Sequence, residues 1–334
     1  MSSGTNRRRD AERAAAELER DLADSDPDRP NPTWVQFRDR YEAEVLPSLS
    51  RSSLTQWITT ANWIEKTIKP QRLGDINKSL LSRFTAKLRE HNLAEASVQS
   101  YLNTLQAALG WAEEVDLVER APRLRMRRQA RGAKQMRSRP ITAEEFERIV
   151  MAVPKVRPRD AAEWEKFLHG LWHSGLRVDE LRRLSWDDAA DLAIDTTHDV
   201  PLIRMMASGH KARRHEFQPM TPQFWDLIKG GDRIGYVFTF SATRKGPQLS
   251  LKTTIRNVAA IGEAAGVITE AATGKTATSH DIGRRAFLTR MDQLLTVPEL
   301  QKWARHASPQ TTMGYYHHRT AVELGRKVWA AAGQ

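Results

Sequence analysis

Apolar residues at helical spacing constrain the fold of the first third of this chain. The clearest pattern repeats at i, i+3, i+4 and i+7 and consists of Val98, Tyr101, Leu102, Leu105, Leu109 and Ala112. Such a stripe covers one face of an α-helix, and that face has to be buried against other helices. Three further stripes lie at 34–45, 54–68 and 80–88. We therefore predict a helical domain over 33–118, with its Trp and Tyr side chains in the core.

Length and composition narrow the class of protein. A chain of 334 residues favours two domains. The absence of cysteine excludes disulfides, thiolate zinc sites and cysteine nucleophiles. No window approaches 18 apolar residues, so we expect no membrane span. The charged leader at 1–32 lacks the apolar core of a secretory signal, which favours a cytoplasmic location.

Most of the net charge of +11 is concentrated in one internal segment. Residues 119–139 hold eight arginines and one lysine against a single glutamate. This segment is either a solvated linker between domains or a strap that binds a polyanion, because Arg and Lys contacts to phosphates supply most non-specific nucleic-acid affinity. On the second interpretation, the DNA-contacting residues are Arg125, Arg127, Arg128, Arg131 and Lys134.

A second domain is predicted over 140–334, including a C-terminal tail. Thr142 and Glu145 form a capping box that begins a helix, and Ile141 and Phe146 are spaced for a hydrophobic staple. A helical pattern at 163–185 is broken at Ser174-Gly175, a strand-turn-strand pattern occupies 200–219, and helical patterns return after 250. The fold class expected is mainly α with a small β-hairpin (α+β), in two domains.

Six residues of the second domain are suited to phosphate chemistry when they are taken together. A phenol with a pKa of about 10 is a poor nucleophile at neutral pH, and it becomes useful when cations surround both it and a phosphate. Taken singly, each of the six has an ordinary structural explanation, such as a solvated helix arginine or a packed aromatic ring. The six are Arg177, Lys211, His280, Arg284, His306 and Tyr315.

Four segments of the second domain resemble the motifs of a known protein family. HSGLRVDELRRLSWDD, HKARRHEFQPM, SHDIGRRAFLTRM and LQKWARHASPQTTMGYYHH occur in this order along the chain. Over about 140–320 the chain resembles the tyrosine recombinase or phage integrase family. The helical domain is similar in size and position to that family's core-binding domain. The resemblance implies a two-domain clamp around duplex DNA.

The resemblance also implies a role for each residue. Tyr315 would attack the scissile phosphate and form a 3′-phosphotyrosyl link, while Arg177 and Arg284 hold the non-bridging oxygens. Lys211 would be the general acid for the 5′-hydroxyl leaving group. His280 and His306 would hydrogen-bond the phosphate or assist proton transfer. Glu180, one turn after Arg177, would orient that arginine.

Two positions depart from the family's pattern. Arg284 comes four positions after His280 where the family's arginine comes three positions after its histidine, with Gly283 apparently extra, so Arg285 is the alternative second arginine. Residues three and four positions apart on a helix share a face, so both arginines could reach one phosphate. Arg305 stands where the family often has glycine, which is either tolerated or adds a phosphate contact.

The function expected is that of a site-specific DNA recombinase or integrase that works without metal, ATP or another cofactor. Its expected partner is double-stranded DNA, and a nucleoid location agrees with that substrate. We also expect the chain to form a homotetramer on paired DNA sites. Two alternatives stay open, namely a DNA-binding protein of this fold with impaired catalysis and an enzyme of the type IB topoisomerase kind. The tail at 320–334 would pack either on its own domain or on a neighbouring subunit.

Overall fold

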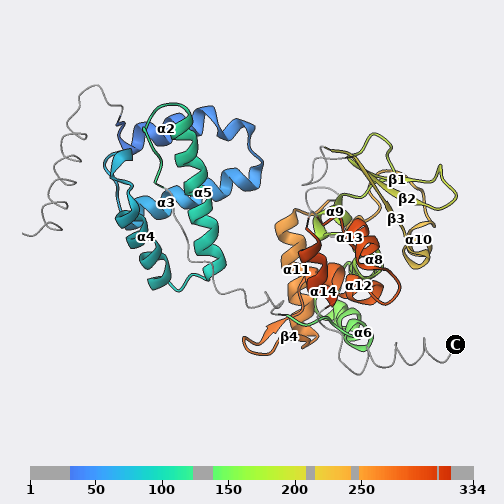
Figure 1. Cartoon of the computed structure of the whole chain (residues 1–334). Helices are drawn as coiled ribbons and strands as arrows, with labels where there is room; N and C mark the ends of the chain where they lie inside the picture. The colour runs from blue at the N-terminus through green and yellow to red at the C-terminus, as the bar shows by residue number, and fades with distance from the viewer. Residues whose placement is uncertain (1–30, 123–137, 208–214, 242–247, 307, 317–334) are drawn as a thin grey trace, which may run out of the picture. The chain divides into compact units, whose positions relative to one another are not determined.

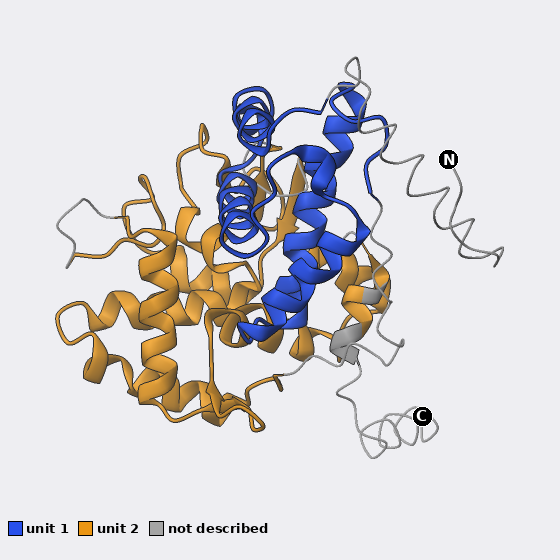
Figure 2. Cartoon of the chain, turned by 90° about the vertical axis from the view of Figure 1, so that its left-hand side faces the viewer, with its two compact units in different colours: residues 1–129 blue, residues 130–334 orange. Residues whose placement is uncertain are grey.

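The computed structural model of the chain describes residues 31–122, 138–207, 215–241, 248–306 and 308–316. Contacts divide the chain into two compact units, residues 1–129 and 130–334, which Figure 2 draws in two colours. The leader at 1–30, the tail from 317 and all five predicted strap residues lie outside the described residues.

The first unit is helical, as its apolar stripes predict. Its α-helices are α2 (Trp34–Glu44), α3 (Arg51–Thr67), α4 (Lys78–Glu90) and α5 (Glu95–Glu114), with 3-10 turns η1 (Leu46–Ser48) and η2 (Leu73–Asp75). Side-chain oxygens of Thr33, Ser50 and Asn77 cap the first three α-helices. Trp34, Tyr41 and Trp57 are at most 5% exposed and pack against one another, so their assignment to the core is confirmed.

The second unit is built around α8 (Ala161–Ser174), whose Trp164, Phe167 and Leu171 are fully buried. Its other helices are α6 (Ala143–Met151), α7 (Val153–Val156), α9 (Val178–Arg183), α10 (Pro222–Ile228), α11 (Leu251–Ala264), α12 (Ala286–Met291), α13 (Val297–Ala304) and α14 (Pro309–Tyr316). The π-helical turn η3 (Asp281–Arg285) runs directly into α12 and packs on α8. Helices α9, α10 and α12 contact α8, and α13 and α14 contact α12 in turn (Figure 1).

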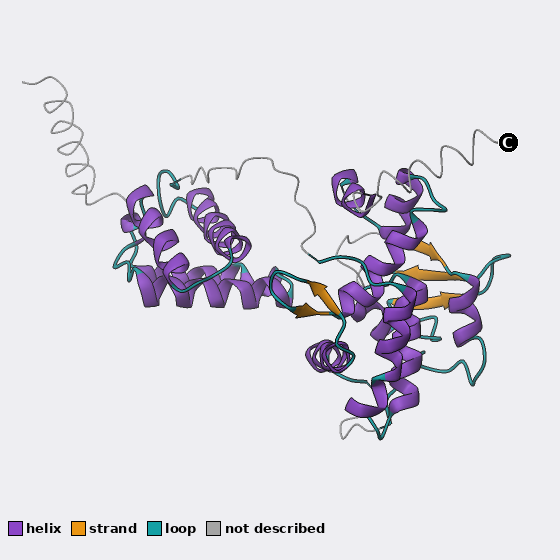
Figure 3. Ribbon diagram, turned by 90° about the horizontal axis from the view of Figure 1, so that it is seen from below, coloured by secondary structure: helices purple, strands orange, loops and turns teal. Residues whose placement is uncertain are grey.

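Two small antiparallel sheets complete this unit. Strands β1 (Leu192–Asp195), β2 (Leu202–Met205) and β3 (Glu216–Pro219) form one sheet in that order, and β4 (Ile268–Glu270) pairs with β5 (Lys275–Thr276). Figure 3 shows the three strands side by side. The sequence predicted the β2–β3 hairpin but missed β1, β4 and β5. Strands β4 and β5 span only three and two residues, too few for a periodic pattern.

The start of the second unit agrees with its sequence signals. Thr142 accepts from the Glu145 amide at 3.2 Å, and Glu145 accepts in return from the Thr142 amide at 3.0 Å, so the predicted capping box is present. Arg139 adds two hydrogen bonds to the Glu145 carboxylate at 2.6 and 2.7 Å. Ile141 and Phe146 are both buried in the core of this unit. These contacts fix the backbone conformation that leads into α6.

A left-handed glycine separates α8 from α9. Gly175 has φ +66°, and a Cβ atom at this position would lie 2.3 Å from Cδ1 of Phe287. No other residue type fits this space without displacing the aromatic ring or the backbone. The resulting turn places Arg177 at the N-cap of α9. The helix break predicted at Ser174-Gly175 is confirmed.

We expect Gly175→Ala to destabilise the second unit by about 2–4 kcal/mol, from left-handed strain and overpacking together. Gly266→Ala is a matched control, because Gly266 has φ +63° but no neighbouring atom within 4 Å of the place that a Cβ atom would take. Gly266→Ala should lower the free energy of unfolding by the backbone strain alone, about 1 kcal/mol. Urea unfolding of the full chain measures both variants, and equal losses of stability would contradict the close packing of Phe287.

Candidate functional site: an arginine and histidine cluster beside α14

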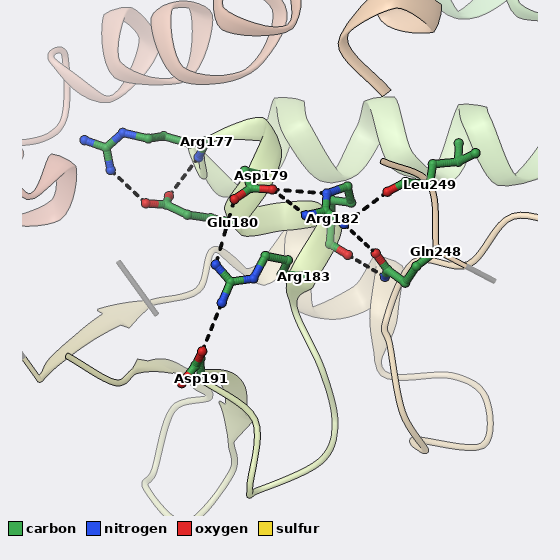
Figure 4. A network of polar contacts seen from close by, with 8 residues as sticks. All are labelled: Arg177, Asp179, Glu180, Arg182, Arg183, Asp191, Gln248 and Leu249. Carbon is green, nitrogen blue, oxygen red and sulfur yellow. Dashed lines mark hydrogen bonds and ion pairs between the residues drawn. The ribbon is translucent and has the colours of Figure 1, made fainter. Parts of the chain in front are cut away.

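Arg177 is held by a carboxylate on its own helix. Its Nη1 lies 2.7 Å from Oε1 of Glu180, and its backbone amide donates to Oε2 of the same carboxylate at 2.9 Å (Figure 4). Glu180 is therefore both the cap of α9 and the partner of the guanidinium. The Arg177 side chain remains 45% exposed, so its other face is open to a ligand. The sequence-based expectation that Glu180 orients Arg177 agrees with this contact.

Glu180 is a buried carboxylate with a second cationic partner. Only 9% of its side chain is exposed, and its Oε2 lies 2.6 Å from Nη2 of Arg305. Burial alone would raise its pKa, but the charges of Arg305 and Arg177 outweigh burial and lower the pKa to about 2. Glu180 is thus ionised throughout the neutral range and fixes two guanidinium groups.

Arg284 lies under the turn that precedes α9. It is 3% exposed, and its Nη1 donates to the carbonyl of Gly175 at 3.1 Å. Its charge also lowers the pKa of Glu180 and of His306, which places it within electrostatic reach of both groups. A residue 107 positions after Arg177 in the sequence therefore lies beside the same site.

The π-helical turn accounts for the extra residue between His280 and Arg284. A π turn holds one residue more than an α-helical turn, so the additional Gly283 is absorbed without breaking the helix. Gly283 is buried, with Leu171 of α8 only 3.3 Å from the position of a Cβ atom. His280 has helical backbone angles, with φ −73° and ψ −38°, and so belongs to the helix rather than to a preceding turn.

Arg284 and Arg285 point to different partners. Arg285 donates to the carbonyl of Ser138 and lies 3.5 Å from Oδ1 of Asp281. The same Asp281 oxygen accepts from the Ser138 hydroxyl at 2.9 Å. Arg285 thus fastens the beginning of the second unit to η3, whereas Arg284 faces Gly175. The two adjacent arginines therefore have different partners and do not reach one phosphate together.

His306 and His280 complete the cluster. Burial, followed by the charges of Arg284 and Arg177, lowers the pKa of His306 to about 4. Its Nδ1 lies 2.9 Å from the hydroxyl oxygen of Thr312 in α14. His280 is exposed, yet desolvation by the surrounding chain and the charge of Arg285 lower its pKa as well, against a smaller opposing effect of Asp281. Both imidazoles are therefore neutral at pH 7.

Tyr315 lies in α14, the helix that follows the His306 loop and packs on α13 and α12. Lys211 lies between β2 and β3 in the sequence and outside the described residues. Among the six residues predicted from sequence, the structure thus brings together Arg177, Arg284, His280 and His306, with the backbone of Tyr315 in the adjoining helix.

The second unit, which holds this cluster, matches a known protein family. A family model described as the phage integrase family covers residues 139–321. The chain belongs to the phage integrase family. This confirms the resemblance seen in the four sequence segments. No curated protein sequence matches the chain significantly.

Solved structures agree with the fold of this integrase. A lambda integrase dimer bound to a COC′ core site is 16% identical, with a TM-score of 0.60, and the match covers 93% of this chain and 87% of that one. The Tn1549 transposon integrase with transposon right end DNA is 14% identical, with a TM-score of 0.60, and covers 89% and 98%. A lambda integrase tetramer on a Holliday junction is 18% identical, with a TM-score of 0.60, and covers 91% and 88%.

Three contacts in this integrase site had no signal in the sequence. Gln218 of β3 donates to the carbonyl of Ser174 at 2.9 Å, Thr312 contacts His306, and Arg305 joins Glu180. In each case the fold, and no pattern in the sequence, determines which residue is the partner. Within the described ranges, no group of three or more His, Asp or Glu side chains is placed to hold a metal ion, and no helix is long and apolar enough to cross a membrane.

We expect Arg284→Gln to raise the pKa of His306 from about 4 toward its ordinary 6.5, because a neighbouring cation disfavours the protonated imidazole. The pKa should stay below 6.5, since burial and Arg177 remain. NMR titration of the histidine ring carbons measures the change. Arg290→Gln is the control: it should raise the pKa of His173, which burial and Arg290 lower to about 4, and leave that of His306 unchanged. An unshifted His306 in Arg284→Gln would contradict the geometry of the cluster.

Proposed function

We propose that this phage integrase family member is a site-specific DNA recombinase that cuts and rejoins strands through a 3′-phosphotyrosyl intermediate. The observation that carries the proposal is the convergence of Arg177, Arg284 and two neutral histidines from distant segments next to α14. That helix holds a tyrosine nine residues after His306. Membership of the family supports the same class of enzyme.

In the proposed reaction, the Tyr315 hydroxyl attacks the scissile phosphorus. A bond forms between the phenolic oxygen and phosphorus while the phenol passes its proton to the neutral imidazole of His280, the bond from phosphorus to the 5′-oxygen breaks, and the 5′-oxygen takes a proton. One phosphodiester is exchanged for another, so the energy of the bond is retained and no ATP is consumed. Rejoining is the reverse attack by a 5′-hydroxyl, which releases the tyrosine.

The arginines stabilise the charge that builds on the phosphate. Arg177 presents its open face to one non-bridging oxygen, with Glu180 holding the guanidinium from behind. Arg284 supplies a second fixed cation in the same cluster. Preorganised cations of this kind lower the barrier because they require no reorganisation during the reaction. We assign the second catalytic arginine to Arg284 because Arg285 is engaged by Ser138 and Asp281.

The remaining three residues hydrogen-bond the phosphate or transfer protons. We assign the Thr312 hydroxyl as the donor to Nδ1 of the neutral His306, so that the imidazole carries its proton on Nε2 and donates a hydrogen bond to the phosphate. His280 is likewise neutral and assists at the same phosphate. Lys211, which lies between β2 and β3 in the sequence, is assigned as the general acid that protonates the 5′-oxygen.

The proposed partner is double-stranded DNA, with the strap residues Arg125, Arg127, Arg128, Arg131 and Lys134 bound to phosphates. Strand exchange between two sites requires four active tyrosines and hence a homotetramer. The similar lambda integrase occurs as a tetramer on a Holliday junction, which supports this assembly. A DNA substrate also favours a cytoplasmic, nucleoid-associated location.

A nicked suicide substrate tests the chemistry. The short strand beyond the cut diffuses away, so the wild type should accumulate a covalent complex that survives denaturing gel electrophoresis. Tyr315→Phe should form no complex, because it lacks the nucleophilic oxygen. Tyr316→Phe is the matched control and should trap DNA like the wild type, since Tyr316 lies ten rather than nine residues after His306.

Absence of an adduct from the wild type, with DNA binding intact, would refute the proposal in favour of a binding protein of this fold. An adduct together with relaxation of supercoiled plasmid by a monomer, and no recombinant product, would replace recombination by topoisomerase-like cleavage. Trapping by Tyr315→Phe would refute the assignment of the nucleophile.

A further inference from the structure

Arg305 occupies a backbone conformation that favours glycine. It ends α13 with φ +53° and ψ +43°, in the left-handed region. An L-residue with a Cβ atom pays about 1–2 kcal/mol there, and glycine does not. An arginine at this position is stable because its side chain forms interactions that offset the strain.

The Arg305 side chain is buried between three elements. Only 4% of it is exposed. One terminal nitrogen, Nη2, lies 2.6 Å from Oε2 of Glu180 in α9, and the other, Nη1, donates to the side-chain oxygen of Gln218 in β3. Glu216, also in β3, has its Oε2 3.9 Å from Nε of Arg305. Both ends of the guanidinium are therefore occupied by protein groups.

The contacts of Arg305 decide between the two explanations that the sequence left open for it. Both terminal nitrogens of its guanidinium are bound by protein groups, Nη2 by Glu180 and Nη1 by Gln218, and so do not face a phosphate. Nor is it merely tolerated, because its loss would leave the buried carboxylate of Glu180 with Arg177 as its only hydrogen-bonded guanidinium among the described contacts.

Arg305 connects three segments, each of which carries or adjoins one proposed catalytic group. Glu180 holds Arg177 with its other oxygen, at 2.7 Å. Gln218 lies on β3, the strand that follows Lys211 in the sequence, and it also donates to the Ser174 carbonyl at 2.9 Å. His306 is the next residue after Arg305. Its backbone amide donates to the Gln301 carbonyl, and its own carbonyl accepts from the Gln301 side chain, both at 3.1 Å.

We propose that Arg305 is a positioning residue that aligns Arg177, the β2–β3 hairpin and His306 around one phosphate. The inference rests on the proposed strand-cleavage function. Arg305 touches neither DNA nor the reacting atoms, and it acts by fixing the relative position of three segments that are far apart in the sequence. A displacement of about 1 Å among such groups costs on the order of a hundredfold in rate.

Arg305→Gly tests this proposal, because glycine relieves the backbone strain and removes only the side chain. Arg305→Asn is a second variant, since asparagine tolerates the same backbone region. Arg305→Lys keeps one charge near Glu180 but not the two-sided contact. Arg182→Gln is the matched control, since Arg182 forms an equally short 2.6 Å pair with Asp179 on the same helix (Figure 4) without touching Arg177 or Glu180.

Two quantities are measured on the full chain with the nicked substrate: the dissociation constant for DNA, and the rate of adduct formation at saturating DNA. Arg305→Gly and Arg305→Asn should bind DNA within about twofold of the wild type and cleave about tenfold to a hundredfold more slowly. Arg305→Lys should fall between them and the wild type, and Arg182→Gln should match the wild type.

Wild-type cleavage rates in both Arg305→Gly and Arg305→Asn would overturn the proposal. Weakened DNA binding with an unchanged rate at saturation would also overturn it, because that result assigns Arg305 to a DNA contact. A wild type that forms no adduct would instead refute the proposed function, so the two failures are distinguishable.

Discussion

One buried carboxylate holds the proposed active site of this phage integrase family member together. Glu180 caps α9 through the Arg177 amide, pairs with the Arg177 guanidinium through Oε1, and pairs with Arg305 through Oε2. A carboxylate taken out of water alone would be protonated, and only the arginines around it keep its pKa near 2. Cations and anion thus stabilise one another, and the exposed face of Arg177 is what remains to bind a phosphate.

Left-handed backbone and a π turn give this arrangement its shape. Gly175 turns the chain from α8 into α9, and the carbonyl at that turn accepts from Arg284. The π turn η3 absorbs one extra residue, and of the two adjacent arginines Arg284 faces the cluster while Arg285 anchors Ser138. Irregular local geometry, rather than the regular helices, therefore decides which arginine belongs to the site.

The fold and most of the site could be predicted from sequence because their signals are local. Helical periodicity, the Thr142 capping box and the Gly175 break each depend on a few neighbouring residues, and all are present. Arg305 could not be interpreted, since its partners Glu180 and Gln218 lie 125 and 87 positions away. The sequence left Arg285 open as an alternative to Arg284 for a related reason, because the extra residue after His280 is absorbed by a π turn that no local pattern signals. The roles of Lys211 and of the strap 119–139 stay predictions.

The central claim is that the charge of Glu180 organises the cations for cleavage. The most direct measurement is the rate of covalent adduct formation by Glu180→Gln at saturating nicked DNA, because glutamine keeps the shape and removes the charge. Asp179→Asn removes the neighbouring carboxylate, which pairs with Arg182 instead, and serves as the control. The account predicts that Glu180→Gln cleaves at least about tenfold more slowly while Asp179→Asn cleaves normally. Equal rates for Glu180→Gln and the wild type would contradict it.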